Sequence, residues 1–176
     1  SITARRGVVR AVWRSAMAFA PSDMKLRSSA FDYHTRIPTK YTQEGENVSP
    51  PLHWNGVPDG TTRFALLCHD PDAPLVQNGA YGFVHWIVSG ISGDVRSLEE
   101  GATLGVAGLH DGGGTGYAGP MPPEGHGTHH YYFWLFALNA DPQLPAGADL
   151  ATFLNAIEPH LLGMNRLVGT YRRGDE

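Results

Sequence analysis

Three short groups of polar residues stand at the ends of apolar runs and could together form one binding pocket. They are Asp70-Pro71-Asp72-Ala73-Pro74, His85-Trp86 and His129-His130-Tyr131. Imidazole and phenol groups can donate hydrogen bonds to phosphate oxygens, and such bonds are stronger when the imidazole is protonated. A nearby carboxylate can orient a histidine or accept hydrogen bonds from an ammonium or hydroxyl group. These residue types predict a pocket for a small anion.

The apolar runs beside these groups are typical of buried β-strands. They cover residues 64–68, 83–91 and 131–138. Side chains alternate between the two faces of a strand, so His129 and Tyr131 are predicted to share one face. His130 is then predicted to point away from them. The third group therefore contributes two side chains to the pocket.

Alternation in the second run makes a specific prediction for His85. It places this imidazole on the same face as Phe83 and Ile87. The opposite face then carries Val84, Trp86 and Val88. A single imidazole is therefore expected to project from an apolar face.

Two prolines stiffen the loop that carries the carboxylates. Pro71 and Pro74 have fixed φ angles, and each pushes the residue before it toward an extended conformation. The loop is therefore predicted to be a stiff corner. Within it, Asp70 is assigned to the pocket and Asp72 to a structural role.

The same residues, in this order, resemble the two signatures of the phosphatidylethanolamine-binding protein family, also called Raf-kinase-inhibitor-like. The second signature corresponds to Gly127-Thr128-His129-His130-Tyr131. Segments that resemble the bacterial branch of the family are residues 40–42, 45–52, 54, 116–120 and 167–171. The resemblance runs from about Met24 to Arg173. Several motifs in the right order over most of the chain make it specific.

Two departures from the family pattern concern the pocket. The usual Arg of the second signature is His130 here, and the Glu-Trp pair that usually precedes the pocket histidine is replaced by Gly82-Phe83. Anion recognition is therefore expected to differ in detail from that of other members.

The resemblance implies a fold and a function. The expected fold is a mainly antiparallel β-sandwich, with two sheets packed face to face, Greek-key character and a C-terminal helical segment. The expected function is reversible, non-catalytic binding of a small phosphate-like anion or phosphoethanolamine-type lipid headgroup, with His85 as a donor. The residues expected to bind the ligand are Asp70, Ala73, Pro74, His85, Gly119, Pro122, Pro123, His129 and Tyr131, with the loop from Gly119 to Pro123 bordering the anion.

Two other functions stay open. Members of the family are linked to kinase regulation and protease inhibition, so the first alternative is an interaction module with a kinase or protease as partner. The second is a metal-dependent hydrolase, because the chain has nine histidines. No compact metal-ligand motif or Gly-x-Ser-x-Gly turn supports catalysis. We therefore expect a binding protein and no enzyme, cofactor or bound metal.

The composition limits the partners and the cellular locations expected of the protein. The chain has 176 residues and a formal net charge of −4, which makes nucleic acid an unexpected partner. No apolar stretch approaches the ~20 residues needed to span a bilayer, so the protein is expected to be soluble and cytoplasmic, with a periplasmic or secreted location as the alternative. Cys68 lies in an apolar run, where a buried and inert thiol is expected.

The first 23 residues differ from the rest of the chain. Arginines at positions 5, 6, 10 and 14 precede any acidic residue, and apolar residues at 9, 12, 16 and 20 recur at near-helical spacing. Residues 1–23 are expected to form an extension of unknown role, either a targeting segment or a helix docked on the domain or a second subunit. Residues 24–176 are expected to form one domain, and a homodimer is left open.

Overall fold

The computed structural model describes residues 22–74 and 82–174 of the chain. The expected amphipathic or targeting segment falls almost entirely on residues 1–21 and so lies outside the described residues. The elements are β1 (Lys25–Arg27), η1 (Thr39–Tyr41), β2 (Leu52–Asn55), β3 (Arg63–Asp70), β4 (Phe83–Ser92), β5 (Ser97–Leu98), β6 (Val106–Ala107), β7 (His129–Leu138), α2 (Leu150–Ile157), η3 (Glu158–His160) and β8 (Leu161–Tyr171).

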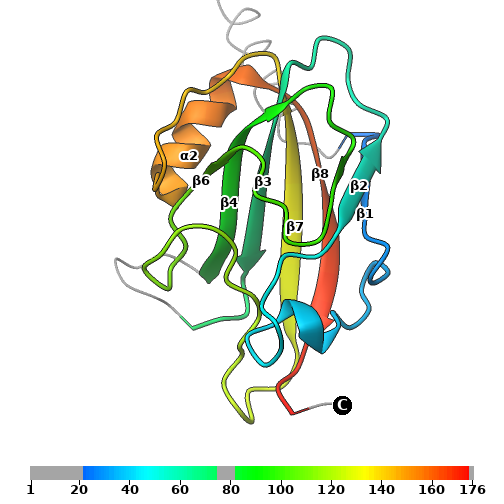
Figure 1. Cartoon of the computed structure of the whole chain (residues 1–176), viewed down its shortest axis with the longest axis vertical. Coiled ribbons are helices and arrows are strands. Elements are labelled where there is room, and N and C mark those ends of the chain that lie inside the picture. Colours follow the sequence, from blue (N-terminus) through cyan, green and yellow to red (C-terminus); the bar gives the residue numbers. More distant parts are fainter. Residues whose placement is uncertain (1–21, 75–81, 175–176) are drawn as a thin grey trace, which may run out of the picture.

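Two antiparallel sheets make up most of this structure (Figure 1). The smaller has the order β1-β2-β5 and the larger the order β6-β4-β3-β7-β8. Strands β3, β4, β6 and β7 follow one another along the chain within the larger sheet, and β7 returns to lie beside β3. This is the spatial order of a Greek key. The predicted mainly antiparallel fold with Greek-key character is confirmed.

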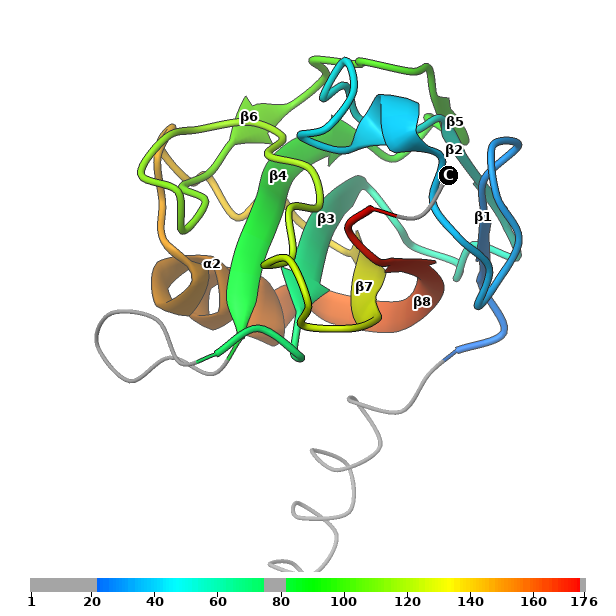
Figure 2. The ribbon, with the colours of Figure 1, turned by 90° about the horizontal axis from the view of Figure 1, so that it is seen from below.

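The main core lies between the two sheets. Buried side chains from the smaller sheet, such as Leu52 and Trp54, pack against Phe64 and Phe133 of the larger one. The ring centroids of Trp54 and Phe64 are 5.3 Å apart. Figure 2 shows the smaller sheet and α2 on opposite sides of the larger sheet. The expected face-to-face packing of two sheets is therefore present.

The C-terminal helical segment covers part of the other face of the larger sheet. Helix α2 begins after Asp149, whose carboxylate accepts a hydrogen bond from the Thr152 backbone N–H at 2.8 Å, as an N-cap residue does. Phe153 and Ile157 of α2 pack against buried residues of the sheet, including Leu67. Among the described residues, no helix is long and apolar enough to cross a bilayer.

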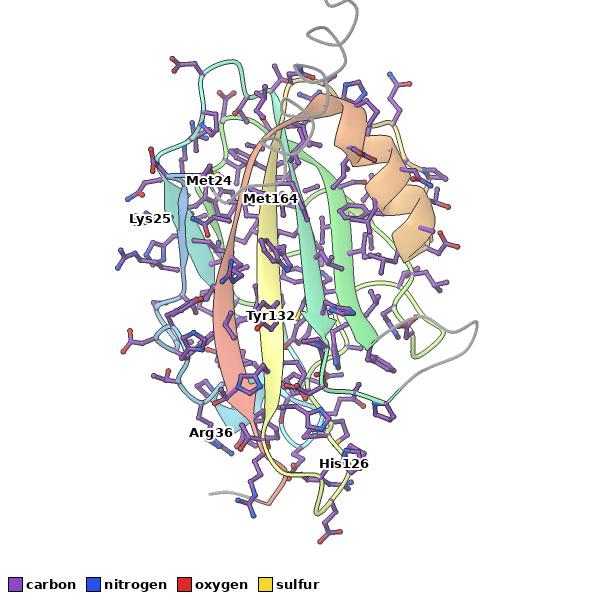
Figure 3. All side chains as sticks on the ribbon, turned by 180° about the vertical axis from the view of Figure 1, so that it is seen from behind. Met24, Lys25, Arg36, His126, Tyr132 and Met164 are labelled. Atoms are coloured by element: carbon purple, nitrogen blue, oxygen red, sulfur yellow. The ribbon has the colours of Figure 1, made fainter. Side chains whose placement is uncertain are left out.

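Strand β7 alternates as predicted. His129, Tyr131 and Phe133 are buried, the last two in the core between the sheets, whereas His130, Tyr132 and Trp134 are only partly buried. In Figure 3, Tyr132 lies on the opposite face of the sheet. His130 occupies that same face and is also directed away from His129. Because the side chains alternate regularly at the beginning of β7, His129 and Tyr131 both reach the pocket side of the sheet.

Strand β4 does not alternate as predicted, because it contains a β-bulge at His85. The register pairs Cys68 with Trp86 and then His69 with Val84, so β4 has one residue more than β3 at this point. Trp86 consequently faces the main core, whereas Val84 and Ile87 face α2. His85 still shares a side with Phe83. The predictions that it shares a face with Ile87 and that Trp86 shares one with Val84 are wrong.

Candidate anion-binding pocket

The candidate site is a pocket at one end of three adjacent strands. Asp70 is the last residue of β3, and His85 and His129 lie at the beginnings of β4 and β7. Because β3 is antiparallel to both neighbours, these three strand ends lie together at the same end of the sheet. The pocket has a volume of about 240 Å³ and is lined by Gln43, Asp70, Ala73, Pro74, Phe83, His85, Met121, Pro122, Pro123, His129 and Tyr131.

The pocket gathers all the residues expected from the sequence except Gly119. That glycine lies behind the wall, where its N–H donates to Asn47 Oδ1 at 2.7 Å and its carbonyl accepts from Gln43 Nε2 at 2.9 Å. These contacts hold the Pro122-Pro123 loop against the rest of the domain. Gly119 is thus placed to support the wall.

Two lining residues, Gln43 and Phe83, were not expected from the sequence, whereas Met121 belongs to the expected loop from Gly119 to Pro123. Phe83 occupies a position where the chain departs from the family pattern, and that departure was the one signal available. Gln43 comes from the turn after η1 and belongs to no motif with a known spacing to the strands.

Asp70 and His129 form a buried pair. The Nδ1 atom of His129 lies 2.7 Å from Asp70 Oδ2, and both side chains are only 3% exposed. The other carboxylate oxygen, Oδ1, accepts the Asp72 backbone N–H at 2.8 Å. Asp70 therefore fixes the orientation of the imidazole, with the Nδ1 proton donated to the carboxylate. The Nε2 atom of His129 is left 3.4 Å from Nδ1 of His126, in the loop before β7 (Figure 3).

His85 is held by the backbone of the pocket loop. Its Nδ1 lies 2.7 Å from the carbonyl oxygen of Ala118, and the Ala118 N–H donates to the His85 carbonyl at 2.9 Å. A carbonyl oxygen can only accept, so Nδ1 carries the proton. Burial lowers the pKa of His85 to about 4, so the ring is neutral at pH 7 and its Nε2 is a hydrogen-bond acceptor. This differs from the expected donor role of His85.

Tyr131 presents a buried hydroxyl group. Its side chain packs edge-on against His85, with ring centroids 5.2 Å apart. The hydroxyl oxygen is buried and has no hydrogen-bond partner among the described residues. Burial raises the pKa of Tyr131, so the hydroxyl keeps its proton and can donate.

His130 and Asp72 join the rim of the pocket to β7. The Asp72 Oδ2 atom accepts both the His130 backbone N–H at 2.8 Å and Nδ1 of its ring at 2.6 Å. Both side chains are more than 40% exposed. His130 therefore points away from the pocket, as predicted, and Asp72 has the structural role expected from the sequence.

The remaining chemistry of the site is limited by its residue types. Within the described part of the chain, no three His, Cys, Asp or Glu side chains gather closely enough to hold a metal ion. Cys68 is fully buried, and burial raises the pKa of its thiol well above the usual range. The arrangement thus offers a hydrogen-bond donor at Tyr131 and an acceptor at His85 in a mostly apolar pocket.

The two packed antiparallel sheets and the short C-terminal helix place the chain in the class of mainly β sandwich proteins. The family model described as phosphatidylethanolamine-binding protein matches residues 27–172. This chain belongs to that family.

Known relatives cover most of the chain. A protein of Methanothermobacter thermautotrophicus named UPF0098 is 42% identical over 158 residues, which are 86% of this chain and all of the relative. A protein of Mycobacterium tuberculosis named as a candidate lipoprotein, LppC, is 42% identical over 156 residues, 86% of this chain and 74% of the relative.

Solved structures show the same fold. The homologue CT736 of Chlamydia trachomatis has a TM-score of 0.79 and 36% identity, covering 85% of this chain and 97% of that one. A carboxypeptidase Y inhibitor, solved with its cognate proteinase, has a TM-score of 0.50 and 20% identity, covering 86% of this chain and 85% of that one. The second likeness concerns the fold alone.

Proposed function

We propose that this chain binds a small phosphate-like anion or a phosphoethanolamine-type headgroup in the pocket, reversibly and without covalent chemistry. The observation that carries the proposal is the buried, unpartnered hydroxyl of Tyr131 on the pocket wall. A buried hydroxyl without a hydrogen bond costs about 1–3 kcal/mol. A ligand oxygen in the pocket would accept this hydrogen bond and remove the cost.

The Asp70–His129 pair supports the same function. Both oxygens of the carboxylate already accept hydrogen bonds, one from His129 and one from the Asp72 backbone. The carboxylate is therefore occupied, and it orients the imidazole so that Nε2 is the atom left for other partners. When protonated, this nitrogen can donate a charge-assisted hydrogen bond to an anion.

The size and the lining of the pocket suit a headgroup. A volume of about 240 Å³ accommodates a ligand of few atoms, and Phe83, Met121, Pro122 and Pro123 make much of the wall apolar. Hydrogen bonds are stronger in such surroundings than in water. Phosphoethanolamine has about eight heavy atoms, so we expect weak affinity.

Calorimetric titration with phosphoethanolamine tests the proposal. Tyr131→Phe removes only the hydroxyl and should weaken binding about tenfold, because one hydrogen bond to a charged group is lost. His129→Ala should abolish measurable binding. His53→Ala changes an exposed histidine on β2 and should bind like the parent protein.

Two results would count against the proposal. One is the absence of binding by the parent protein, and the other is unchanged affinity in both Tyr131→Phe and His129→Ala. Because His129→Ala leaves a buried carboxylate without its partner, its fold should be checked by circular dichroism. Tyr131→Phe preserves the shape of the side chain and keeps the test valid if His129→Ala unfolds.

The kinase- or protease-inhibiting module and the metal-dependent hydrolase remain sequence-based alternatives. No described contact favours either of them over ligand binding. Capture of a single kinase or protease by the immobilised protein would support the first, and turnover of a phosphate ester that a chelator abolishes would support the second.

A further inference from the structure

We infer that the pocket selects a phosphate group that carries a proton, such as the monoanion of a phosphate monoester, because His85 offers it an acceptor. This inference rests on the proposed function and deepens it, since it specifies which phosphate species the same pocket takes.

The geometry around His85 determines which ring nitrogen is free. Nδ1 donates to the Ala118 carbonyl at 2.7 Å, and the return bond from the Ala118 N–H fixes this loop against β4. The ring also lies between Phe83 and Tyr131, at centroid distances of 4.7 Å and 5.2 Å. A neutral imidazole with its proton on Nδ1 has a lone pair on Nε2.

The Nε2 atom is available to a ligand. His85 lines the pocket, and no described residue forms a hydrogen bond with Nε2. Because Nδ1 is occupied by the Ala118 carbonyl, Nε2 is the ring nitrogen of His85 left for a ligand in the pocket.

The surroundings of His85 keep it neutral. The titratable groups around it are Asp70 and His69 of β3, His129 and Tyr131 of β7, and His110 of the loop after β6. Burial, the largest effect, lowers the pKa of His85. The hydrogen bond to the Ala118 carbonyl and the charge of Asp70 act in the opposite direction, and His69 and His110 add to the lowering. His85 therefore remains an acceptor across the physiological range.

An acceptor and donors on the same wall select a particular ligand. Tyr131 can donate to one unprotonated phosphate oxygen, and Nε2 of His85 can accept a hydrogen bond from a P–OH group. Sulfate is fully ionised near neutral pH and would set an oxygen lone pair against the lone pair of His85. Dimethyl phosphate has the single charge of a monoester monoanion but no proton to donate.

Competition among three small anions tests the inference. At pH 5.5, methyl phosphate should bind at least about tenfold more tightly than sulfate or dimethyl phosphate, because only it satisfies the acceptor. Between pH 5.5 and pH 8 its affinity should fall by several tens of fold, since the monoanion becomes a minor species above a pKa of about 6. The affinities of sulfate and dimethyl phosphate should not fall in proportion to the monoanion fraction of methyl phosphate.

The comparison with sulfate and dimethyl phosphate separates ligand protonation from protonation of the protein. Deprotonation of a protein group would weaken all three anions in the same proportion, so the ratio of the methyl phosphate affinity to the sulfate affinity isolates the proton on the ligand. A ratio that stays constant between pH 5.5 and pH 8 would overturn the inference. Equal affinity for the three anions at pH 5.5 would also overturn it, while leaving the proposed anion site intact. If none of them bound, both proposals would fail.

A lipid headgroup could satisfy Nε2 of His85 with a donor other than a P–OH group. Glycerophosphoethanolamine has an ammonium N–H but no P–OH, and glycerophosphocholine has neither. If glycerophosphoethanolamine bound as tightly as methyl phosphate while glycerophosphocholine did not, the donor would be the ammonium, and the assignment to the phosphate would be overturned. Weak binding of both diesters is the expected result.

Two further measurements address His85 directly. His85→Asn retains an amide that can donate to the Ala118 carbonyl but lacks Nε2, so the preference for methyl phosphate should fall to near unity. Nitrogen NMR of the parent protein does not depend on any variant folding. It should show Nδ1 protonated and Nε2 unprotonated at pH 7, and a proton on Nε2 would overturn the inference.

Discussion

At the scale of single residues, His85 connects the pocket to the pH dependence of stability. Its pKa is lowered from 6.5 to about 4 by burial. The unfolded chain therefore binds a proton that the folded chain does not bind between these two values. The stability conferred by the neutral ring is fully present above pH 6.5 and is lost as the pH falls to about 4.

We expect this single residue to make the free energy of unfolding fall by about 3 kcal/mol over that interval, as a shift of this size implies. Guanidinium unfolding at pH 7, 5.5 and 4.5, in buffers without phosphate, would measure the fall. In His85→Asn the fall should be smaller by about the same amount. Identical pH profiles for the two proteins would contradict the neutral, buried state of His85.

At the scale of elements, the β-bulge in β4 decides which side chains reach the pocket. The extra residue on β4 places both His85 and Trp86 on the inner side of the sheet. The backbone just before β4 is equally constrained, because Gly82 has a φ of +78° and approaches β3 closely. A Cβ at this position would collide with the Asp70 carbonyl oxygen and lie 2.8 Å from the His69 ring.

Gly82→Ala should therefore destabilise the fold by more than about 1 kcal/mol, since it combines an unfavourable φ with a backbone clash. Gly125→Ala is the matched control, because Gly125 has a φ of +79° and no atom within 4 Å of the added Cβ. Thermal unfolding of the two variants separates the clash from the dihedral cost. Equal losses of stability would show that the close approach to Asp70 contributes nothing.

At the scale of the whole molecule, Cys68 reports on the integrity of the two-sheet core. It lies in β3, the central strand of the larger sheet, and is fully buried between the sheets. Burial also raises the pKa of its thiol, which suppresses the reactive thiolate. Reaction therefore requires that the sheets separate.

We expect Ellman's reagent to leave the native protein unlabelled at pH 8 and to react with one thiol per chain in guanidinium, because Cys68 is the single cysteine. The labelling rate at intermediate denaturant should follow global unfolding measured by fluorescence. Rapid labelling of the native protein would show that this part of the core opens locally.

Much of this architecture follows from local patterns in the sequence. Alternation along residues 129–136 predicted that His129 and Tyr131 share a face while His130 turns away, and β7 confirms this. The C-terminal helical segment implied by the family resemblance is present as α2, and Asp149 caps it through a backbone N–H only three residues away. These features depend on interactions within a few residues, so the amino-acid order is sufficient to specify them.

The membership of the pocket was predicted in part. Asp70, His85 and His129 were recognised by motif and meet at one end of the sheet, whereas Gln43 comes from a turn without any such signal. Where a loop crosses the end of a sheet depends on long-range contacts, such as the bond from Gln43 Nε2 to the Gly119 carbonyl. No pattern within the loop itself encodes such a long-range contact.

Hydrophobic periodicity and helix capping act over a few residues, so the amino-acid order specifies the strands, the helix and the polar residues at the strand ends. The orientation of His85, and which of its nitrogens is free, depend instead on contacts between distant segments. That outcome depends on the bulge between β3 and β4 and on the Ala118 carbonyl, 33 residues away. Burial among distant segments, absent in the isolated strand, makes this histidine an acceptor and leaves Tyr131 without a partner.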